Sequence, residues 1–340
     1  MRLLIVGADE VHAIENFYFK YIRAEGVEVN LLPAHRIFNE YYYKNIYNKL
    51  RYKLGISDIL KKINCLVKET VESFQPEIIL VFKGMELSAE TLTWVKGRNI
   101  KLVNYNPDNP FIFTGKGSGN ENIKACLPLY DLHFTYNREI EKQLKADLSA
   151  RTSFLPFGYD IPENVCKEES DQPEMLKLCF LGNPDTRRAY FLKQLAEKGV
   201  TMDVYGNHWH KFIAHPGITI FPPVYETELW KVLRRYRIQL NMMRMHNENS
   251  HNMRSFEVPA IGGIMLAPDT VEHRLFFEDG EEVFLYKNIG DCIERSRYIL
   301  DLPGESAAQI RSNAALRCVQ SGYSYKERAR QVIRELELLR

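Results

Sequence analysis

Short, uninterrupted apolar runs alternate along the first half of the chain with longer stretches whose apolar residues recur every three or four positions. Runs such as 3–6 and 78–82 are typical of strands covered on both faces, and the longer periodic stretches indicate helices. The predicted order is strand 3–6, helix 13–25, strand 27–32, a helical stretch 39–74, strand 78–82, helix 89–97, strand 101–105, strand 132–136, helix 139–148 and strand 153–155. This alternation predicts a parallel, doubly wound α/β sheet.

A polar, acidic, proline-containing stretch at 156–173 interrupts the pattern, and a second series then begins. It runs through strand 178–181, helix 187–198, strand 200–205, strand 219–221, helix 226–236, strand 238–242, a short helix that Gly262 and Gly263 end, strand 264–267, strand 283–286 and helices 289–300, 305–321 and 325–339. We therefore predict two Rossmann-like halves. The predicted domains are 1–158 and 176–325, with a linker at 159–175 and a C-terminal helix at 326–340.

Composition supports this organisation, because 340 residues exceed one ordinary core, and 45% hydrophobic with 26% charged residues is typical of a globular protein. The net charge of +1 provides no global attraction for nucleic acid, so we expect no nucleic-acid partner. Acidic residues at 9 and 10 argue against a signal peptide, and no run of about 18 apolar residues occurs. We therefore expect a cytoplasmic protein.

The cysteines are scattered, without a C-x-x-C pair or a histidine at metal spacing, and we expect buried, reduced thiols. They are Cys65, Cys126, Cys166, Cys179, Cys292 and Cys318.

Residues 252–268 carry the most specific candidate chemistry. Arg254 and Glu257 stand three residues apart on a predicted helix and so share a face. Gly262 and Gly263 follow, where the backbone can approach a ligand without an intervening Cβ. An acceptor for ribose hydroxyls, a fixed cation for phosphate and bare backbone N–H groups suit a nucleotide. The same pattern also fits an ordinary αβ unit with a glycine helix stop and a surface ion pair.

Several motifs in this half together resemble the CgeB-like, spore-maturation type glycosyltransferases, which are relatives of the retaining family-four enzymes. The motifs are Phe180-Leu-Gly182-Asn183 with Arg187 and Arg188, Asn252-x-Arg254-x-Phe256-Glu257-x-Pro259-Ala260-x-Gly262-Gly263, Glu278-Asp-Gly-Glu281-Glu282 and Tyr323-x-Tyr325-x-x-Arg328. The N-terminal half matches more loosely, through Lys83-Gly84 and Asn106-Pro-Asp108-Asn-Pro110. The resemblance implies the GT-B fold, with two Rossmann-like domains facing across a cleft.

It also implies a nucleoside-diphosphate sugar (UDP-, GDP- or dTDP-linked) as co-substrate in the C-terminal domain, and no separate cofactor. Glu257 would bind the ribose hydroxyls, and Arg187, Arg188 and Arg254 would neutralise the diphosphate. Gly182, Asn183, Gly206, Gly262 and Gly263 would complete the donor site, since the glycines end predicted strands or the helix beside them. Lys83 and Asn106 are candidates on the side of the unidentified acceptor.

One position departs from the family-four pattern Glu-x7-Glu. Eight residues before Glu257 stands Asn249, and Glu248 is out of step by one. An amide can hydrogen-bond a sugar hydroxyl but cannot stabilise a positive anomeric centre as a carboxylate would. Two alternatives to a glycosyltransferase therefore stay open: a nucleotide-sugar epimerase or hydrolase, and a non-catalytic nucleotide-sugar-binding protein.

The sequence contains no Asp-x-Asp, the usual metal-diphosphate clamp of the other major glycosyltransferase architecture. We therefore expect metal-independent transfer with retention, through an oxocarbenium-like route in which arginines and backbone N–H groups stabilise the leaving group. Asp108 is a candidate to orient a substrate hydroxyl, or else it lies in an Asx turn of a proline-rich loop. His12 is a candidate to contact phosphate or acceptor, or else it is a surface or helix-cap histidine.

The segment 41–62 interleaves tyrosines with lysines and arginines on a predicted helix. Such a face could make a weak peripheral contact with anionic lipid or bind an anionic acceptor. The alternative is a solvated helix that packs its tyrosines on the sheet.

Overall fold

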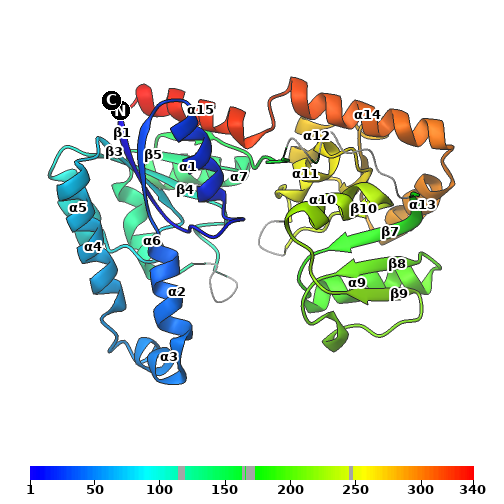
Figure 1. The fold of residues 1–340 in the computed structure, drawn as a ribbon, viewed down its shortest axis with the longest axis horizontal. Coiled ribbons are helices and arrows are strands. Elements are labelled where there is room, and N and C mark those ends of the chain that lie inside the picture. The colour runs from blue at the N-terminus through cyan, green and yellow to red at the C-terminus, as the bar shows by residue number, and fades with distance from the viewer. Residues whose placement is uncertain (114–118, 163–164, 166–172, 245–247) are drawn as a thin grey trace. The chain divides into compact units, whose positions relative to one another are not determined.

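The computed structural model describes residues 1–113, 119–162, 165, 173–244 and 248–340. The chain divides into two compact units, shown in Figure 1. Unit 1 comprises Met1–Pro156 together with Tyr325–Arg340, and unit 2 comprises Phe157–Ser324. Of the predicted linker, residues 163–164 and 166–172 lie outside the described residues, as does Cys166.

A six-stranded parallel sheet in the order β2-β1-β3-β4-β5-β6 forms the centre of unit 1. Its strands are β1 (Arg2–Val6), β2 (Glu28–Leu32), β3 (Ile78–Phe82), β4 (Lys101–Asn106), β5 (Leu132–Thr135) and β6 (Thr152–Phe154). The two apolar runs that we predicted as strands covered on both faces form β1 and β3, which are inner strands of the sheet. All five residues of β3 are buried. The predicted doubly wound arrangement is confirmed for this unit.

Helices cover both faces of this sheet: α1 (Ile14–Ala24), α2 (Ala34–Lys44), α3 (Ile46–Lys53), α4 (Ile59–Phe74), α5 (Ala89–Lys96), α6 (Glu121–Cys126), α7 (Arg138–Leu148) and α15 (Tyr325–Glu337). The last helix packs beside α1, with the rings of Phe17 and Tyr325 stacked at 4.7 Å. The C-terminal segment of the chain thus completes the core of the N-terminal unit (Figure 1). No helix in the described part of the chain has the length and apolarity to cross a membrane.

The helical stretch predicted at 39–74 is not continuous in the structure. Asn45 adopts an extended conformation, and its side chain accepts a hydrogen bond from the backbone N–H of Asn48, so it ends α2 and caps α3. Gly55, at φ +73°, ends α3 in the left-handed region that glycine adopts at no steric cost. These two residues divide the stretch into α2, α3 and α4.

Unit 2 is built on a second six-stranded parallel sheet, in the order β12-β11-β10-β7-β8-β9. Its strands are β7 (Met175–Leu181), β8 (Met202–Tyr205), β9 (Ile218–Phe221), β10 (Tyr236–Leu240), β11 (Met265–Pro268) and β12 (Phe284–Tyr286). Its helices are α9 (Thr186–Glu197), α10 (Glu226–Arg235), α11 (Arg254–Ala260), α12 (Val271–Phe276), α13 (Ile289–Asp301) and α14 (Gly304–Gln320). The predicted doubly wound arrangement is confirmed here as well.

The strand order of unit 2 reverses between β7 and β10. From β7 the chain proceeds outward through β8 to β9, and it then returns to place β10 on the other side of β7. In open α/β sheets, the connections leaving the two central strands diverge at such a reversal and leave room for a ligand beyond the carboxyl ends. The same reversal occurs in unit 1 between β1 and β3.

One cysteine expectation was wrong. Cys126, Cys179, Cys292 and Cys318 are buried, but Cys65 is exposed. It lies on α4 outside the stripe of Ile59, Ile63, Val67 and Val71 that faces the core, so the helix turns its thiol toward solvent.

Candidate functional site

Arg188 connects the two strand ends at which the order of the unit 2 sheet reverses. It lies in the first turn of α9, directly after β7, and is 8% exposed. Its Nη1 donates to the carbonyl oxygen of Asn183, which follows β7, at 3.1 Å. Its Nη2 donates to the carbonyl oxygen of Met242, which follows β10, at 2.8 Å. A cation is therefore fixed at the point of the sheet where open α/β folds bind their ligands.

The guanidinium of Arg188 has a carboxylate nearby, which forms an ion pair with it but no hydrogen bond. The carboxylate of Asp185 lies 3.6 Å from Nε, beyond hydrogen-bond distance, and Nε has no partner among the described residues. Burial lowers the pKa of Arg188, with Asp185 acting in the opposite direction. The nearest aromatic ring is that of Phe180, with the guanidinium carbon 5.6 Å from its centroid. A desolvated cation whose counter-ion makes no direct hydrogen bond to it favours an anionic ligand.

Gly182 and Gly206 lie at the ends of the neighbouring strands β7 and β8, where the backbones nearly touch. A Cβ on Gly206 would stand 2.2 Å from the carbonyl oxygen of Gly182, so no other residue fits without movement. That carbonyl also accepts a hydrogen bond from the indole Nε1 of Trp209 at 2.8 Å. Both glycines thus serve the close packing of strand ends, and Trp209 is a buried core residue.

Arg254 and Glu257 form an ion pair on the first turn of α11, as their spacing predicts. Nη1 of Arg254 donates to Oε2 of Glu257. Glu257 is buried, at 7% exposure, and its pair with Arg254 uses only Oε2. The carboxylate is consequently held in place at one oxygen, with acceptor capacity at the other.

The glycine pair after this helix has a complete structural explanation. The N–H of Gly263 donates to Val258 O at 2.8 Å and that of Gly262 to Pro259 O at 3.0 Å, which is the bond pattern of a Schellman helix end. Gly262 has φ +78°, and a Cβ on Gly263 would stand 2.9 Å from the carbonyl oxygen of Leu233. The pair therefore ends α11 and lets it pack against α10.

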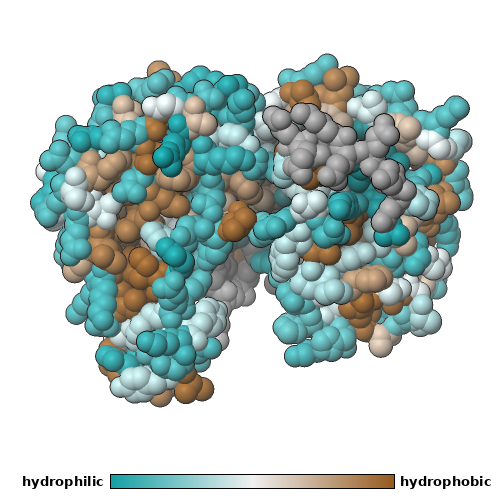
Figure 2. All heavy atoms as spheres, in the orientation of Figure 1, coloured by the Kyte–Doolittle hydropathy of each residue, from teal (hydrophilic) through white to brown (hydrophobic). Residues whose placement is uncertain are grey.

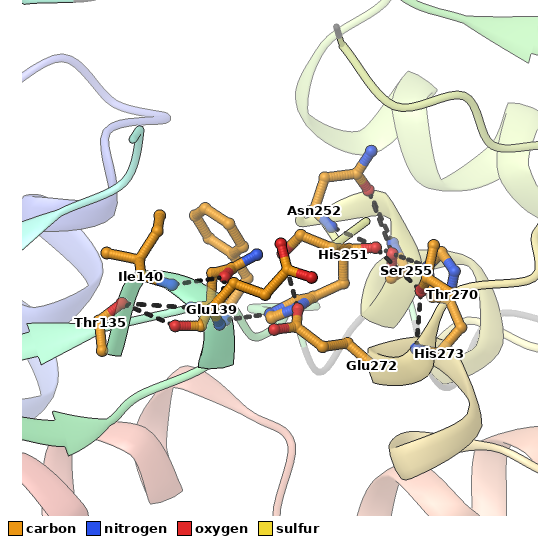
Figure 3. Close-up of polar contacts among 12 residues, drawn as sticks. Thr135, Glu139, Ile140, His251, Asn252, Ser255, Thr270, Glu272 and His273 are labelled. Atoms are coloured by element: carbon orange, nitrogen blue, oxygen red, sulfur yellow. Dashed lines mark hydrogen bonds and ion pairs between the residues drawn. The ribbon is translucent and has the colours of Figure 1, made fainter. Parts of the chain in front are cut away.

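A buried hydrogen-bond network fixes the loop between β10 and α11, as Figure 3 shows. Oε2 of Glu272 accepts from the hydroxyl of Ser250 and pairs with Nδ1 of His251, each at 2.6 Å. The backbone N–H of Phe157 donates to Nε2 of His251 at 3.2 Å, which assigns the proton of the neutral ring to Nδ1. His251 and Ser250 are fully buried, so this loop is held from within the unit.

A second set of polar contacts orients the start of α11. Nδ2 of Asn241 donates to Ser255 Oγ at 3.1 Å, and Nδ2 of Asn252 donates to Asn241 Oδ1 at 2.8 Å. Ser255 Oγ in turn lies 2.8 Å from Nε2 of His273, whose Nδ1 lies 2.7 Å from Pro268 O (Figure 3). Burial lowers the pKa of His273 to about 4. These residues position Arg254 and Glu257 by fixing the helix on which both lie.

Sequence reasoning missed the part of this network that comes from α12. The helix has a recognisable start, since the side chain of Thr270 accepts from the N–H of His273. What the sequence does not show is that Glu272 and His273 fold back beneath the loop at 250–252, about twenty positions earlier in the chain.

The remaining donor candidates lie on the surface of unit 2. Asn183, Arg187 and Asn249 are exposed. Arg187 pairs with Glu248, the acidic residue one position out of step with the family-four pattern. Unlike the buried Arg188, Arg187 remains 67% exposed.

In unit 1, Lys83 and Asp108 are brought together at the carboxyl ends of β3 and β4. Nζ of Lys83 lies 2.6 Å from Oδ2 of Asp108, and both side chains are 23% exposed. Lys83 has φ +59°, a conformation that a non-glycine residue adopts only at an energetic cost. Gly84 follows at φ +90°. The strained turn at the strand reversal of unit 1 thus holds a cation against a carboxylate.

Asn106 and His12 complete the predicted residues of unit 1. The side-chain oxygen of Asn106 accepts from the N–H of Asp108 at 3.0 Å, so the proline-rich loop does contain an Asx turn, made by Asn106. The amide nitrogen Nδ2 of Asn106 is buried without a partner among the described residues. His12 is exposed in the loop between β1 and α1. No group of three or more metal-ligating side chains gathers in the described ranges.

The chain is similar to known glycosyl transferase-like proteins in sequence and to solved structures in fold. Residues 187–334 match a family described as "Glycosyl transferase-like". Spore protein CgeB of Bacillus subtilis is 21% identical over 260 residues, which cover 72% of this chain and 78% of that protein. Sucrose-phosphate synthase from Thermosynechococcus elongatus has the same fold, with a TM-score of 0.73 at 10% identity over 100% of this chain and 99% of its own. A structure of trehalose-6-phosphate from E. coli bound with UDP-2-fluoro glucose matches with a TM-score of 0.67 at 12% identity, over 99% of each chain.

Proposed function

Because the chain is a CgeB-like protein with a glycosyl transferase-like domain and a GT-B fold, we propose that it transfers a sugar from a nucleoside-diphosphate sugar to an acceptor. The observation that carries the proposal is the buried guanidinium of Arg188, held by two backbone carbonyls at the strand reversal of unit 2. That position suits the diphosphate, the most highly charged part of such a donor.

Arg188 would stabilise the negative charge that develops on the diphosphate as its bond to the sugar breaks. A guanidinium is always charged and is planar, so it can donate two parallel hydrogen bonds to phosphate oxygens. Arg187 lies in α9, which follows β7, and Arg254 lies in α11, which follows β10. Both would contribute further positive charge, and Arg187 would first have to break its ion pair with Glu248. No metal ion is required in this scheme.

Glu257 would bind the ribose of the nucleotide. Its Oε2 is already held by Arg254, which fixes the carboxylate, and its Oε1 has acceptor capacity for a ribose hydroxyl. A hydrogen bond to a charged acceptor contributes about 1.5–3 kcal/mol, enough to distinguish a nucleotide from a bare phosphate ester.

The chemical step we propose is substitution with retention. The bond between the anomeric carbon and the diphosphate oxygen breaks, an acceptor hydroxyl attacks the same face, and its proton passes to the departing diphosphate oxygen. Asp108, held by Lys83, would orient a substrate hydroxyl for this step. Asn249 stands where the family-four pattern has a carboxylate, and its amide would hydrogen-bond a donor sugar hydroxyl.

Incubation of the protein with UDP-, GDP- and dTDP-sugars tests the proposal, with analysis of both the nucleotide and the sugar. Release of nucleoside diphosphate that depends on an added acceptor supports transfer. A changed sugar that stays linked to its nucleotide would indicate an epimerase, and acceptor-independent release would indicate a hydrolase. Tight binding of a nucleotide sugar without turnover, with acceptors of every class present, would indicate a binding protein.

A further inference from the structure

The short helix α3 and its flanks present a strongly apolar surface to solvent. None of the residues of α3 is buried. The exposed large apolar residues of this segment are Tyr43 (66%), Ile46 (85%), Tyr47 (62%), Leu50 (54%), Leu54 (62%) and Ile56 (61%). Positions 47, 50 and 54 follow the spacing of one face of α3, and Tyr43 lies in the last turn of α2. Figure 2 shows scattered apolar side chains among polar ones at this end of unit 1, where α3 lies in Figure 1. We refer to residues 43–56 as the α3 surface.

This exposure does not come from a loosely attached segment. The inward side of α3 carries Tyr52, whose ring lies 4.9 Å from that of Phe38 and 5.7 Å from that of Tyr42. Phe38, Tyr41 and Tyr52 in turn pack on the core cluster of unit 1. The tyrosines of the segment are therefore divided: Tyr41 and Tyr52 pack inward, whereas Tyr43 and Tyr47 face solvent with the aliphatic residues.

The ends of α3 are also well formed. Asn45 caps its start, and the N–H groups of Gly55 and Ile56 donate to Tyr52 O and Arg51 O in a Schellman end. The apolar face is therefore presented by an ordered helix.

The charge of the α3 surface is one-sided. Residues 41–57 contain Lys44, Lys49, Arg51 and Lys53 and no acidic residue, whereas the whole chain has a net charge of only +1. The lysine and arginine side chains lie over the tyrosine rings, with Lys49 Nζ 4.8 Å from the Tyr43 ring and the guanidinium carbon of Arg51 5.7 Å from the Tyr47 ring. Apolar side chains surrounded by cations are complementary to a surface with negative charge above an apolar layer.

We propose that the α3 surface docks the protein on an anionic lipid bilayer. Ile46, Leu50 and Leu54 would enter the boundary between head groups and acyl chains, while the lysines and Arg51 would reach outward to the lipid phosphates. Pairing with the same surface of a second copy is disfavoured, because it would bring four cations against four. The proposal is independent of glycosyl transfer.

Vesicle flotation at low salt tests this. We compare neutral phosphatidylcholine vesicles with vesicles that contain about one-third phosphatidylglycerol. The protein should float only with the anionic vesicles and should dissociate as salt is raised to about 0.5 M, because screening shortens the electrostatic range. Failure to bind anionic vesicles at low salt overturns the proposal.

Two variants separate the charge from the apolar contribution. Each lysine or arginine near an anionic surface strengthens binding about fivefold, so replacing all four by Gln should weaken binding on the order of a hundredfold or more. Leu50→Ser with Leu54→Ser should weaken binding to anionic vesicles although the charge is unchanged. Matched controls alter exposed residues elsewhere with the same change in charge or apolarity: Lys142, Lys193, Lys198 and Lys211 to Gln, and Leu316 and Val319 to Ser.

The control variants should bind vesicles as the unchanged protein does, and all variants should keep its circular dichroism spectrum. Equal loss of binding in controls and α3 variants would overturn the assignment to this surface. Sedimentation velocity without lipid measures the oligomeric state and so tests the alternative that a second copy of the chain covers the α3 surface. A dimer that Leu50→Ser with Leu54→Ser dissociates, combined with absent vesicle binding, would show that a second copy covers the surface and would also overturn the proposal.

Discussion

The guanidinium of Arg188 reaches the carbonyl oxygen of Met242 at 2.8 Å, although the two residues are 54 positions apart. This bond joins the connection after β7 to the connection after β10, the two central strands of the unit 2 sheet. Two carbonyl dipoles orient the guanidinium, and its counter-ion Asp185 lies 3.6 Å from Nε without a hydrogen bond to it. A buried charge arranged in this way remains available to an anionic ligand.

Replacing Arg188 should affect ligand binding more than replacing its neighbour in sequence. We expect Arg188→Gln to weaken nucleoside-diphosphate binding by about 1.5–3 kcal/mol, because charged hydrogen bonds to phosphate are lost. Arg187→Gln should cost at most about 1 kcal/mol, since that exposed side chain already shares its charge with Glu248. Isothermal titration calorimetry with UDP, GDP and dTDP measures both. Unfolding by urea serves as the control: a loss of stability in Arg188→Gln with unchanged affinity would make this arginine purely structural.

Glu257→Ala should weaken binding of the nucleotide sugar by roughly 1.5–3 kcal/mol, because it removes charge-assisted hydrogen bonds to the ribose. Glu228→Ala, which removes an exposed acid from α10, is the matched control and should leave the affinity unchanged. Competition binding with a fluorescent nucleotide gives both values. If Glu257→Ala binds the donor as the unchanged protein does, the ribose assignment is wrong.

Asp108→Asn should lower turnover more than donor affinity. The amide still fits the loop, but its oxygen accepts a hydrogen bond from a substrate hydroxyl less strongly than the carboxylate does. The ion pair with Lys83 would be lost at the same time, so Lys83→Met is the comparison variant. Steady-state kinetics separate kcat from KM for both. An effect confined to the donor KM would instead place Asp108 in donor binding.

Acid should destabilise the fold through two buried histidines. Burial lowers the pKa of His133 in unit 1 and of His273 in unit 2 to about 4 each, from the usual 6.5. Between those values the unfolded chain binds a proton at each position that the folded chain does not. Each neutral histidine therefore contributes stability that is complete above pH 6.5 and is lost as the pH falls toward 4, up to about 3 kcal/mol per group.

Thermal unfolding from pH 7 to pH 4 measures this loss. His133→Gln and His273→Gln should each show a shallower decline of Tm over that range than the unchanged protein. His210→Gln, which alters an exposed histidine, should follow the unchanged curve. Parallel curves for all four proteins would contradict the assignment.

The glycine pair after α11 can be tested by stability alone. Gly263→Ala should destabilise the protein by about 1–3 kcal/mol, because its Cβ would meet the carbonyl oxygen of Leu233 at 2.9 Å. Gly262→Ala should cost about 1 kcal/mol through its positive φ alone, since its Cβ would meet nothing within 4 Å. Gly304→Ala, at a helical position with open space, should be neutral or stabilising. Urea unfolding ranks the three, and a Gly263→Ala protein as stable as Gly304→Ala would refute the packing explanation.

Much of the fold was predictable because it depends on local pattern. A parallel strand covered on both faces must be apolar throughout, so β3 was predicted at its observed bounds. The pairing of Arg254 with Glu257 was also predictable, since three positions on a helix bring side chains together whatever surrounds them.

Other features of the site could not be read from the chain. The sequence does not show that His251 and Asn241 are buried centres of the hydrogen bonds that fix α11. Glu272, the partner of His251, comes from α12, whose position under the loop is set by packing. Asn241 instead bonds to Asn252 and Ser255. Arg187 and Arg188 looked equivalent as neighbours, and only their burial separates them.

The sequence by itself determined two doubly wound sheets, the position of the Arg254–Glu257 pair and the glycine end of α11, because hydrophobic periodicity, helix geometry and backbone sterics act over a few residues. The tertiary structure decided that α15 completes the core of unit 1, that Arg188 alone is the buried cation of its pair, and that α3 turns an apolar and basic face outward. Those outcomes depend on which surfaces stay exposed to solvent after elements that are distant in the sequence have packed together. No local pattern carries that information.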